Sequence, residues 1–164
     1  MVRFETSHGG FTIQLYEREA PLSVANFLKY VDDGFFDGTI FHRIVPGFVI
    51  QGGGLTADFS QKKTREPVKN EAANGLLNER GSLSMARTDA PHSATSQFFV
   101  NLQDNDFLDY RPGSHGYAVF GRVVDGIEVI DKIAAVRTGR RQGYTDAPME
   151  DVIINSAKRV AAAG

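Results

Sequence analysis

One apolar segment of the sequence, FHRIVPGFVIQGG at residues 41–53, carries two polar side chains among residues that favour a protein core. Arg43 and Gln51 stand on opposite sides of the turn-forming pair Pro46-Gly47, each a few residues from it. If the two apolar runs pair as adjacent strands across that turn, these side chains lie near each other. They could therefore serve one site, to which Arg43 would contribute a hydrogen-bond donor that stays charged at every physiological pH.

A structural explanation exists for both polar residues. An arginine at the rim of a sheet can reach water with its head group or pair with a carboxylate such as Glu71, and a glutamine before three glycines also fits a rim. Gln97, in the apolar run SATSQFFV, is a further polar residue of this kind. It favours a binding groove with a few donors and aromatic walls, for which the candidates are Phe48, Phe98 or Phe99.

The composition limits the classes of protein that need consideration. With 164 residues, 41% of them hydrophobic, the chain has the size of one domain and can bury a core without disulfides or metals. We expect a single domain over residues 1–164. A formal net charge of -2 offers no broad attraction to nucleic acid or to an anionic membrane. The two basic stretches, QKKTREPVK and TGRRQG, are expected to be solvated loops that bind no polyanion.

The residues that usually carry covalent or metal chemistry are missing or scattered. The chain has no cysteine, which excludes disulfides, thiolate metal sites and thiol nucleophiles. Its histidines lack the spacing of metal ligands, and no G-x-S-x-G motif supports nucleophilic catalysis by a serine. We therefore expect neither a metal nor a cofactor.

The sequence gives no sign of export or membrane insertion. The opening stretch MVRFETSHGGFTIQLYE alternates apolar and polar residues and does not have the pattern of a signal peptide. No run approaches the roughly 18 to 20 apolar residues that a membrane span requires. We expect a cytoplasmic protein without a membrane partner.

Hydrophobic periodicity predicts mostly β structure. Residues 2–6 and 11–15 alternate apolar and polar side chains around the turn-forming HGG, which is typical of a hairpin. Further short apolar runs bounded by turn residues predict strands in TIFHRIV, FVIQGG, GSLSMA, SQFFVNL, YAVFGRVV and EDVIINSAKRV. Residues 52–78 lack sustained periodicity and are expected to form surface loops, and the final AAAG is expected to be a frayed tail.

Two segments have helical spacing instead. APLSVANFLKYVDDG, at residues 20–34, begins with Pro21 near its first turn and ends at Gly34. DGIEVIDKIAAV, at residues 125–136, places its isoleucines on one helical face. Short antiparallel strands with two separated helices fit a closed or nearly closed β-barrel capped by the helices, because closure removes exposed strand edges.

Several stretches together resemble one known family: FHRIVPGFVIQGG, NEAANGLLNERGSLSMARTDAPHSATSQFFVN, DNDFLD and YAVFGRVVDGIEVIDKI. They resemble the cyclophilins, which are peptidyl-prolyl cis/trans isomerases, and most closely the bacterial cytosolic type. The resemblance covers about residues 2–160, with its motifs in the expected order. It implies a mainly β fold, a closed eight-stranded antiparallel β-barrel capped by two α-helices, with a shallow outer groove that binds proline-containing segments.

The resemblance also implies a set of site residues. The catalytic arginine falls on Arg43, with Phe48 of the aromatic wall and Gln51 of the groove beside it as further catalytic residues. Substrate-binding positions, which form apolar walls or hold the substrate backbone, fall on Val49, Ala86, Arg87, Gln97, Phe99, Phe107, Leu108 and Tyr117.

Four of these positions depart from the pattern of many eukaryotic members. Phe107 stands where they have the tryptophan associated with cyclosporin binding, so we expect weak cyclosporin affinity without loss of activity. Tyr117 replaces a groove histidine and still supplies a ring and a hydroxyl. Val49 replaces a methionine and Arg87 an asparagine, which leaves the fine substrate preference open.

The implied function is acceleration of rotation about X-Pro bonds in peptides and in unfolded or folding proteins, by a monomer without a covalent intermediate. Two alternatives belong to other classes. A non-catalytic module could bind proline peptides in the same groove, and a hydrolase could use Arg43 with His42 or His92. The hydrolase is the weaker of the two, because His42 and Arg43 project to opposite faces of a strand and no positioned carboxylate is evident.

Overall fold

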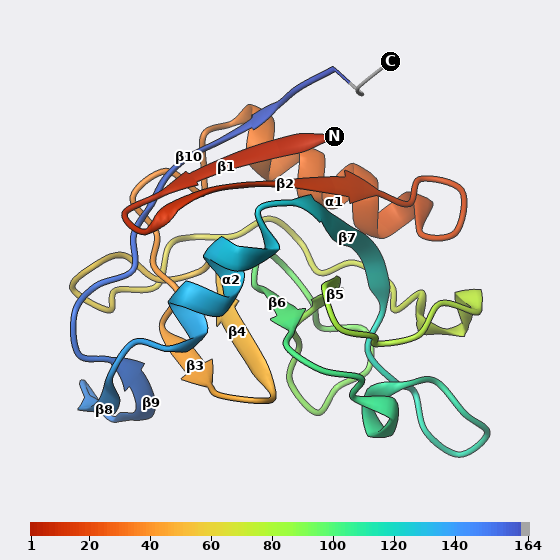
Figure 1. Cartoon of the computed structure of the whole chain (residues 1–164). Coiled ribbons are helices and arrows are strands. Elements are labelled where there is room, and N and C mark those ends of the chain that lie inside the picture. Colours follow the sequence, from red (N-terminus) through yellow and green to blue (C-terminus); the bar gives the residue numbers. More distant parts are fainter. Residues whose placement is uncertain (162–164) are drawn as a thin grey trace.

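Alternating apolar and polar residues build one large antiparallel sheet in the computed structural model, which describes residues 1–161. In the first strand Val2 and Phe4 are fully buried, while Arg3 and Glu5 point outward. The sheet has eight strands in the order β10-β1-β2-β7-β5-β6-β4-β3 (Figure 1). Their bounds are β1 (Val2–Thr6), β2 (Gly9–Leu15), β3 (Arg43–Val45), β4 (Val49–Gly52), β5 (Ser82–Met85), β6 (Phe98–Asn101), β7 (Val119–Asp125) and β10 (Ile154–Arg159).

The two edge strands of this sheet approach each other through the segments that precede them. Ile40 pairs with Ile153 in an isolated bridge. The backbone N–H of Phe41 donates to the carbonyl of Val152 at 3.0 Å, and that of Ile154 donates to Thr39 at 2.8 Å. These contacts join the two edges of the curled sheet, which forms a barrel. The predicted mainly β fold is therefore confirmed.

A cluster of phenylalanines fills the barrel. The rings of Phe4 and Phe11 stack with centroids 4.9 Å apart, and Phe98 lies 5.7 Å from both Phe4 and Phe27. Phe98 is fully buried. Of the neighbouring pair Phe98 and Phe99, therefore, the first belongs to the core and only the second can face outward.

Two α-helices pack on the sheet, as the sequence predicts. The first, α1 (Pro21–Asp32), has its proline in the first turn and buries Val24, Phe27 and Val31. Its first turn also binds Glu71, whose carboxylate accepts the N–H groups of Leu22 and Ser23 at 3.2 and 2.6 Å. Such a carboxylate satisfies N–H groups that have no partner within the helix. Glu71 therefore caps α1 and does not pair with Arg43.

The second helix, α2 (Ile127–Ala134), follows β7 directly and packs against β2, β3 and β4. It buries Ile130 and Ile133 completely. Residues 52–78 form loops as predicted, with one short 3₁₀ turn, η1 (Ala72–Asn74); a second, η2 (Asp106–Leu108), lies in the DNDFLD stretch. No helix within residues 1–161 is long and apolar enough to cross a membrane. Of the predicted tail AAAG, residues 162–164 lie outside the described part of the chain.

One hairpin departs from the prediction. The stretch TGRRQG was expected to be a solvated loop, but it forms β8 (Thr138–Arg141) and the turn to β9 (Tyr144–Pro148). Gln142 and Gly143 both have positive φ, 50° and 86°, as the turns that favour tight hairpins require. Of the residues in these strands, only Ala147 and Pro148 are buried, and the strands carry little apolar alternation, so hydrophobic periodicity alone does not predict them.

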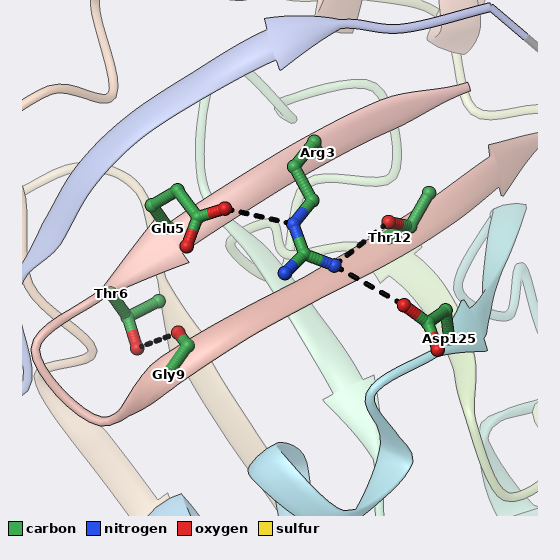
Figure 2. Close-up of polar contacts among 6 residues, drawn as sticks. All are labelled: Arg3, Glu5, Thr6, Gly9, Thr12 and Asp125. Atoms are coloured by element: carbon green, nitrogen blue, oxygen red, sulfur yellow. Dashed lines mark hydrogen bonds and ion pairs between the residues drawn. The ribbon is translucent and has the colours of Figure 1, made fainter.

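The outer face of the sheet near the chain start is organised around Arg3 (Figure 2). Its Nε donates to Glu5 at 2.9 Å, and its Nη1 donates to Thr12 at 3.2 Å and to Asp125 at 3.3 Å. The guanidinium lies over Gly10, where a Cβ would overlap it. The arginine thus ties β1, β2 and β7 together across three neighbouring strands.

Candidate active site

Most of the site residues predicted from the sequence surround one groove on the outside of the barrel. Nine of the eleven predicted residues line it: Arg43, Phe48, Val49, Gln51, Ala86, Arg87, Phe99, Leu108 and Tyr117. Strands β3, β4 and β6 supply one side, and the segments that follow β5 and precede β7 supply the other.

The register of three strands aligns the central residues of the groove. Arg43 on β3 pairs with Gln51 on β4, and Gln51 pairs with Phe99 on β6. Residues directly opposite each other in an antiparallel ladder share one face of the sheet. The prediction that Arg43 and Gln51 lie together is therefore confirmed, and Phe99 joins them on the same outer face.

Amide groups hold Arg43 in the groove. Its Nη1 donates to Oε1 of Gln51 at 3.3 Å, and Nε2 of Gln51 donates to Oε1 of Gln97 at 3.0 Å. The guanidinium carbon also lies 5.7 Å from the centre of the Phe48 ring. None of the ion pairs found within residues 1–161 includes Arg43. Its charge is thus oriented by neutral groups and is not compensated by a carboxylate.

Apolar side chains form the walls beside the arginine. Phe99 is only 4% exposed and contacts Tyr117 edge to face, with ring centroids 5.7 Å apart. Phe107 stacks on Phe48 at 5.6 Å but is 60% exposed. Phe107 therefore extends the Phe48 wall outward and is not part of the groove lining itself.

Gln97 lies beside the groove, in a second hollow. This hollow shares Gln51, Ala86 and Arg87 with the groove and continues from it. Its remaining lining residues, which sequence reasoning did not identify, are polar: Gln61, Thr64, Thr88, Ser93 and Thr95. They come from loops without periodicity, so no sequence pattern indicated their proximity.

A buried polar network beneath the Phe48 wall was also missed. Nδ2 of Asn105 donates to the carbonyl of Phe48 at 3.0 Å and to Oδ1 of Asn101 at 2.9 Å. Nδ2 of Asn101 donates in turn to Oδ1 of Asn78 at 3.2 Å. All three asparagines are almost completely buried. Because buried amides are costly unless they are bonded, this network fixes the backbone that carries Phe48.

His42 directly precedes β3 and does not line the groove. It is 3% exposed, its Nδ1 has no partner among the described residues, and its ring lies 5.4 Å from Tyr144 of the β8–β9 hairpin. Burial, and after it the positive charge of Arg43, lowers the pKa of His42 from the ordinary 6.5 to about 4. A buried imidazole that does not line the groove cannot act as a base there.

His92 does not line the groove either. Its Nδ1 accepts the backbone N–H of Asn70 at 3.0 Å. In the part of the chain that the structure describes, no cluster of three His, Cys, Asp or Glu side chains could hold a metal. The hydrolase alternative is therefore left without a base beside Arg43, whereas the convergence of a cation, an amide and aromatic walls suits recognition of a peptide.

The fold places the chain in a class of proteins whose structures are known. A cyclophilin type peptidyl-prolyl cis-trans isomerase of Cryptosporidium parvum, solved in the presence of the dipeptide Ala-Pro, superposes with a TM-score of 0.82 at 26% identity, over 98% of this chain and 99% of that one.

Family and sequence comparisons narrow this class to one family. The model of the cyclophilin type peptidyl-prolyl cis-trans isomerases matches residues 1–159. Peptidyl-prolyl cis-trans isomerase B of Escherichia coli is 55% identical over 159 residues, which cover 95% of this chain and 97% of that protein. A Streptomyces antibioticus peptidyl-prolyl cis-trans isomerase is 51% identical over 96% of each chain. The chain belongs to the cyclophilin type peptidyl-prolyl cis-trans isomerases, and the resemblance seen in its sequence is confirmed.

Proposed function

We propose that this chain accelerates rotation about X-Pro bonds in peptides and in unfolded or folding proteins, as one domain, with Arg43 as the central catalytic group. The observation that carries the proposal is the uncompensated guanidinium of Arg43 beside Gln51 and between apolar walls. The Ala-Pro dipeptide present with the Cryptosporidium relative supports proline-containing segments as the ligand.

The chemistry of the X-Pro bond explains why such a donor is useful. Rotation is slow because the nitrogen lone pair is shared with the carbonyl, which gives a barrier of about 18 to 20 kcal/mol. In the twisted transition state the nitrogen becomes pyramidal and can accept a hydrogen bond, which it does poorly while planar. A donor held at that nitrogen therefore binds the transition state better than the ground state.

Each part of the groove has a role in this scheme. The apolar pocket of Phe48, Val49, Phe99 and Leu108 holds the pyrrolidine ring and excludes water, which strengthens the field of Arg43. Gln51 and the backbone at residues 86–87 hold one end of the bond while the other end turns. Gln97 acts through Gln51, because it accepts the amide N–H that fixes the orientation of Gln51.

The magnitudes require all of these parts. Shortening a step of about 100 s to about 1 ms corresponds to roughly 7 kcal/mol at 1.36 kcal/mol per tenfold change in rate. One hydrogen bond to a charged group contributes roughly 1.5 to 3 kcal/mol. The remainder must come from desolvation of the amide and restraint of its two ends in the pocket.

Exchange NMR on a short Ala-Pro peptide, with catalytic amounts of protein, tests the proposal. We expect rapid exchange between cis and trans signals with the wild type. With Arg43→Ala we expect kcat/KM to fall about 100-fold while peptide affinity changes much less, because the contact forms as the amide twists. Equal losses of peptide affinity and of kcat/KM would contradict the proposed catalytic role of Arg43. Binding shifts without exchange by the wild type would instead favour the non-catalytic module.

Three expectations from the sequence are tested separately. Weak cyclosporin affinity predicts that Phe107→Trp tightens binding of that ligand in a fluorescence titration, since Phe107 is exposed and stacked on Phe48. If the protein is a monomer, as expected, light scattering should give the mass of a single chain. A cytoplasmic location stays a prediction that fractionation of the native cells would test.

A further inference from the structure

A second arginine lies on the rim of the groove, at its junction with the second hollow. Arg87 lines both the groove and the hollow, and its guanidinium carbon lies 4.3 Å from the centre of the Tyr117 ring. It is partly exposed, so its charge faces a path along which a bound peptide could continue beyond the proline pocket.

Backbone carbonyls hold this guanidinium in a fixed orientation. Its Nε and Nη2 donate to the carbonyl of Gly116 at 3.3 and 2.9 Å, and its Nη1 donates to the carbonyl of Thr88 at 2.8 Å. A guanidinium has five N–H groups. Two of them therefore stay available after these three bonds, one on each terminal nitrogen. Because the fork is already ordered, a ligand that binds it loses little additional side-chain entropy.

Within the described residues, no acidic side chain forms an ion pair with this arginine. Neither the groove nor the second hollow is lined by Asp or Glu. Among residues 1–161, the ion pairs of the structure include neither Arg87 nor Arg43. Two ordered cations thus border one peptide path, and only Arg43 is used by the isomerisation mechanism.

We propose that Arg87 selects substrates that carry an Asp or Glu side chain within about three residues of the isomerised proline. The inference rests on the proposed function and names the substrate class of the same groove. Carboxylates match the planar fork of a guanidinium and form charge-assisted hydrogen bonds with it. An extended peptide advances about 3.3 Å per residue, so a side chain near the proline reaches the junction where Arg87 lies.

The competing explanation is a purely structural arginine. Arg87 would then only fasten the segment around Gly116 and Tyr117 through its carbonyl bonds and ring contact. A structural arginine affects all peptides alike, whereas a specificity residue changes the ratio between an acidic peptide and its neutral counterpart.

A peptide panel measured by exchange NMR separates the two explanations. Each peptide contains one Ala-Pro bond and either Glu or Gln at a single position, from three residues before the proline to two after it. At low salt we expect the wild type to show a Glu/Gln ratio of kcat/KM of about three to five at one position or more, as for a partly exposed charge pair. The ratio should approach one at high salt.

Two variants show whether Arg87 causes this preference for acidic peptides. In Arg87→Gln the Glu/Gln ratio should fall to about one. Arg140→Gln is the matched control, because it removes the same charge from an exposed site on β8 that lines neither hollow, and it should keep the wild-type ratio.

Several results would overturn the inference. Ratios near one for the wild type at every position, a ratio that does not respond to salt, or a preference that persists in Arg87→Gln would each exclude Arg87 as the selecting residue while leaving the isomerase intact. Absence of exchange with every peptide would overturn the proposed function and, with it, this inference.

Discussion

The arginine of the outer sheet face and the arginines of the groove have opposite surroundings. Arg3 donates to two carboxylates, Glu5 and Asp125, and its pKa is raised chiefly by the hydrogen bond to Glu5 (Figure 2). Arg43 donates to the amide of Gln51, and Arg87 donates to backbone carbonyls. All three guanidinium groups are ordered, but only the first has its charge balanced by acidic side chains.

Under the proposed function, this difference separates a structural use of arginine from a catalytic one. A carboxylate partner orients an arginine and also neutralises much of the positive electrostatic field that could act on a ligand. A neutral amide or carbonyl orients it while leaving that field free. The contrast leads to three predictions, which concern the reach of the Arg43 field, the need for a neutral partner, and the limited role of Arg3.

The largest of these effects concerns His42, the buried residue directly before Arg43 in the sequence. Its pKa in the folded protein is about 4, lowered by burial and by the uncompensated charge of Arg43, against 6.5 when unfolded. The unfolded state therefore binds a proton more readily, and the folded protein loses stability as the pH falls through this window. Between pH 8 and pH 5 we expect the free energy of unfolding to drop by about 2 kcal/mol from this group.

Denaturant unfolding at several pH values measures the drop. His42→Phe removes the titrating ring from the same site, so the difference in pH dependence between wild type and variant isolates His42 from the carboxylates. Arg43→Gln should reduce the drop, because it removes the second cause of the lowered pKa of His42. Identical pH profiles for wild type and His42→Phe would contradict the prediction.

A second variant would give the groove arginine a carboxylate partner, as Arg3 has on the outer face. Gln51→Glu keeps the shape of the side chain but gives Arg43 a carboxylate partner of the kind that Arg3 has. Since the balanced charge no longer stabilises the twisted amide as well, we expect kcat/KM to fall about tenfold, equivalent to about 1.4 kcal/mol. Exchange NMR on the Ala-Pro peptide measures this.

Gln14→Glu provides the matched control for this change, because Gln14 is exposed on β2 and lines neither hollow. Its activity should stay within about twofold of the wild type. Activity of Gln51→Glu equal to that of the control would mean that Arg43 tolerates a carboxylate partner, and the contrast between the two faces would then carry no catalytic meaning.

The sequence predicts some parts of this contrast and not others, for physical reasons. Arg43 and Gln51 could be placed together because a short turn fixes the register of the strands it joins. Alternation could not say which of Phe98 and Phe99 faces the core, since both are apolar. The second hollow and the asparagines beneath Phe48 depend on loops that are distant in sequence, which no local pattern reports.

The smallest expected effect belongs to Arg3. Its side chain is 34% exposed, so water and salt screen its pairs with Glu5 and Asp125. We expect Arg3→Ala to lower the free energy of unfolding by less than about 1 kcal/mol at low salt, and by less still at high salt. Activity should stay within about twofold of the wild type, because Arg3 lines neither hollow. A large loss of kcat/KM in a stably folded Arg3→Ala protein would show that the outer face influences the groove, and a balanced arginine could then no longer be assigned a purely structural role.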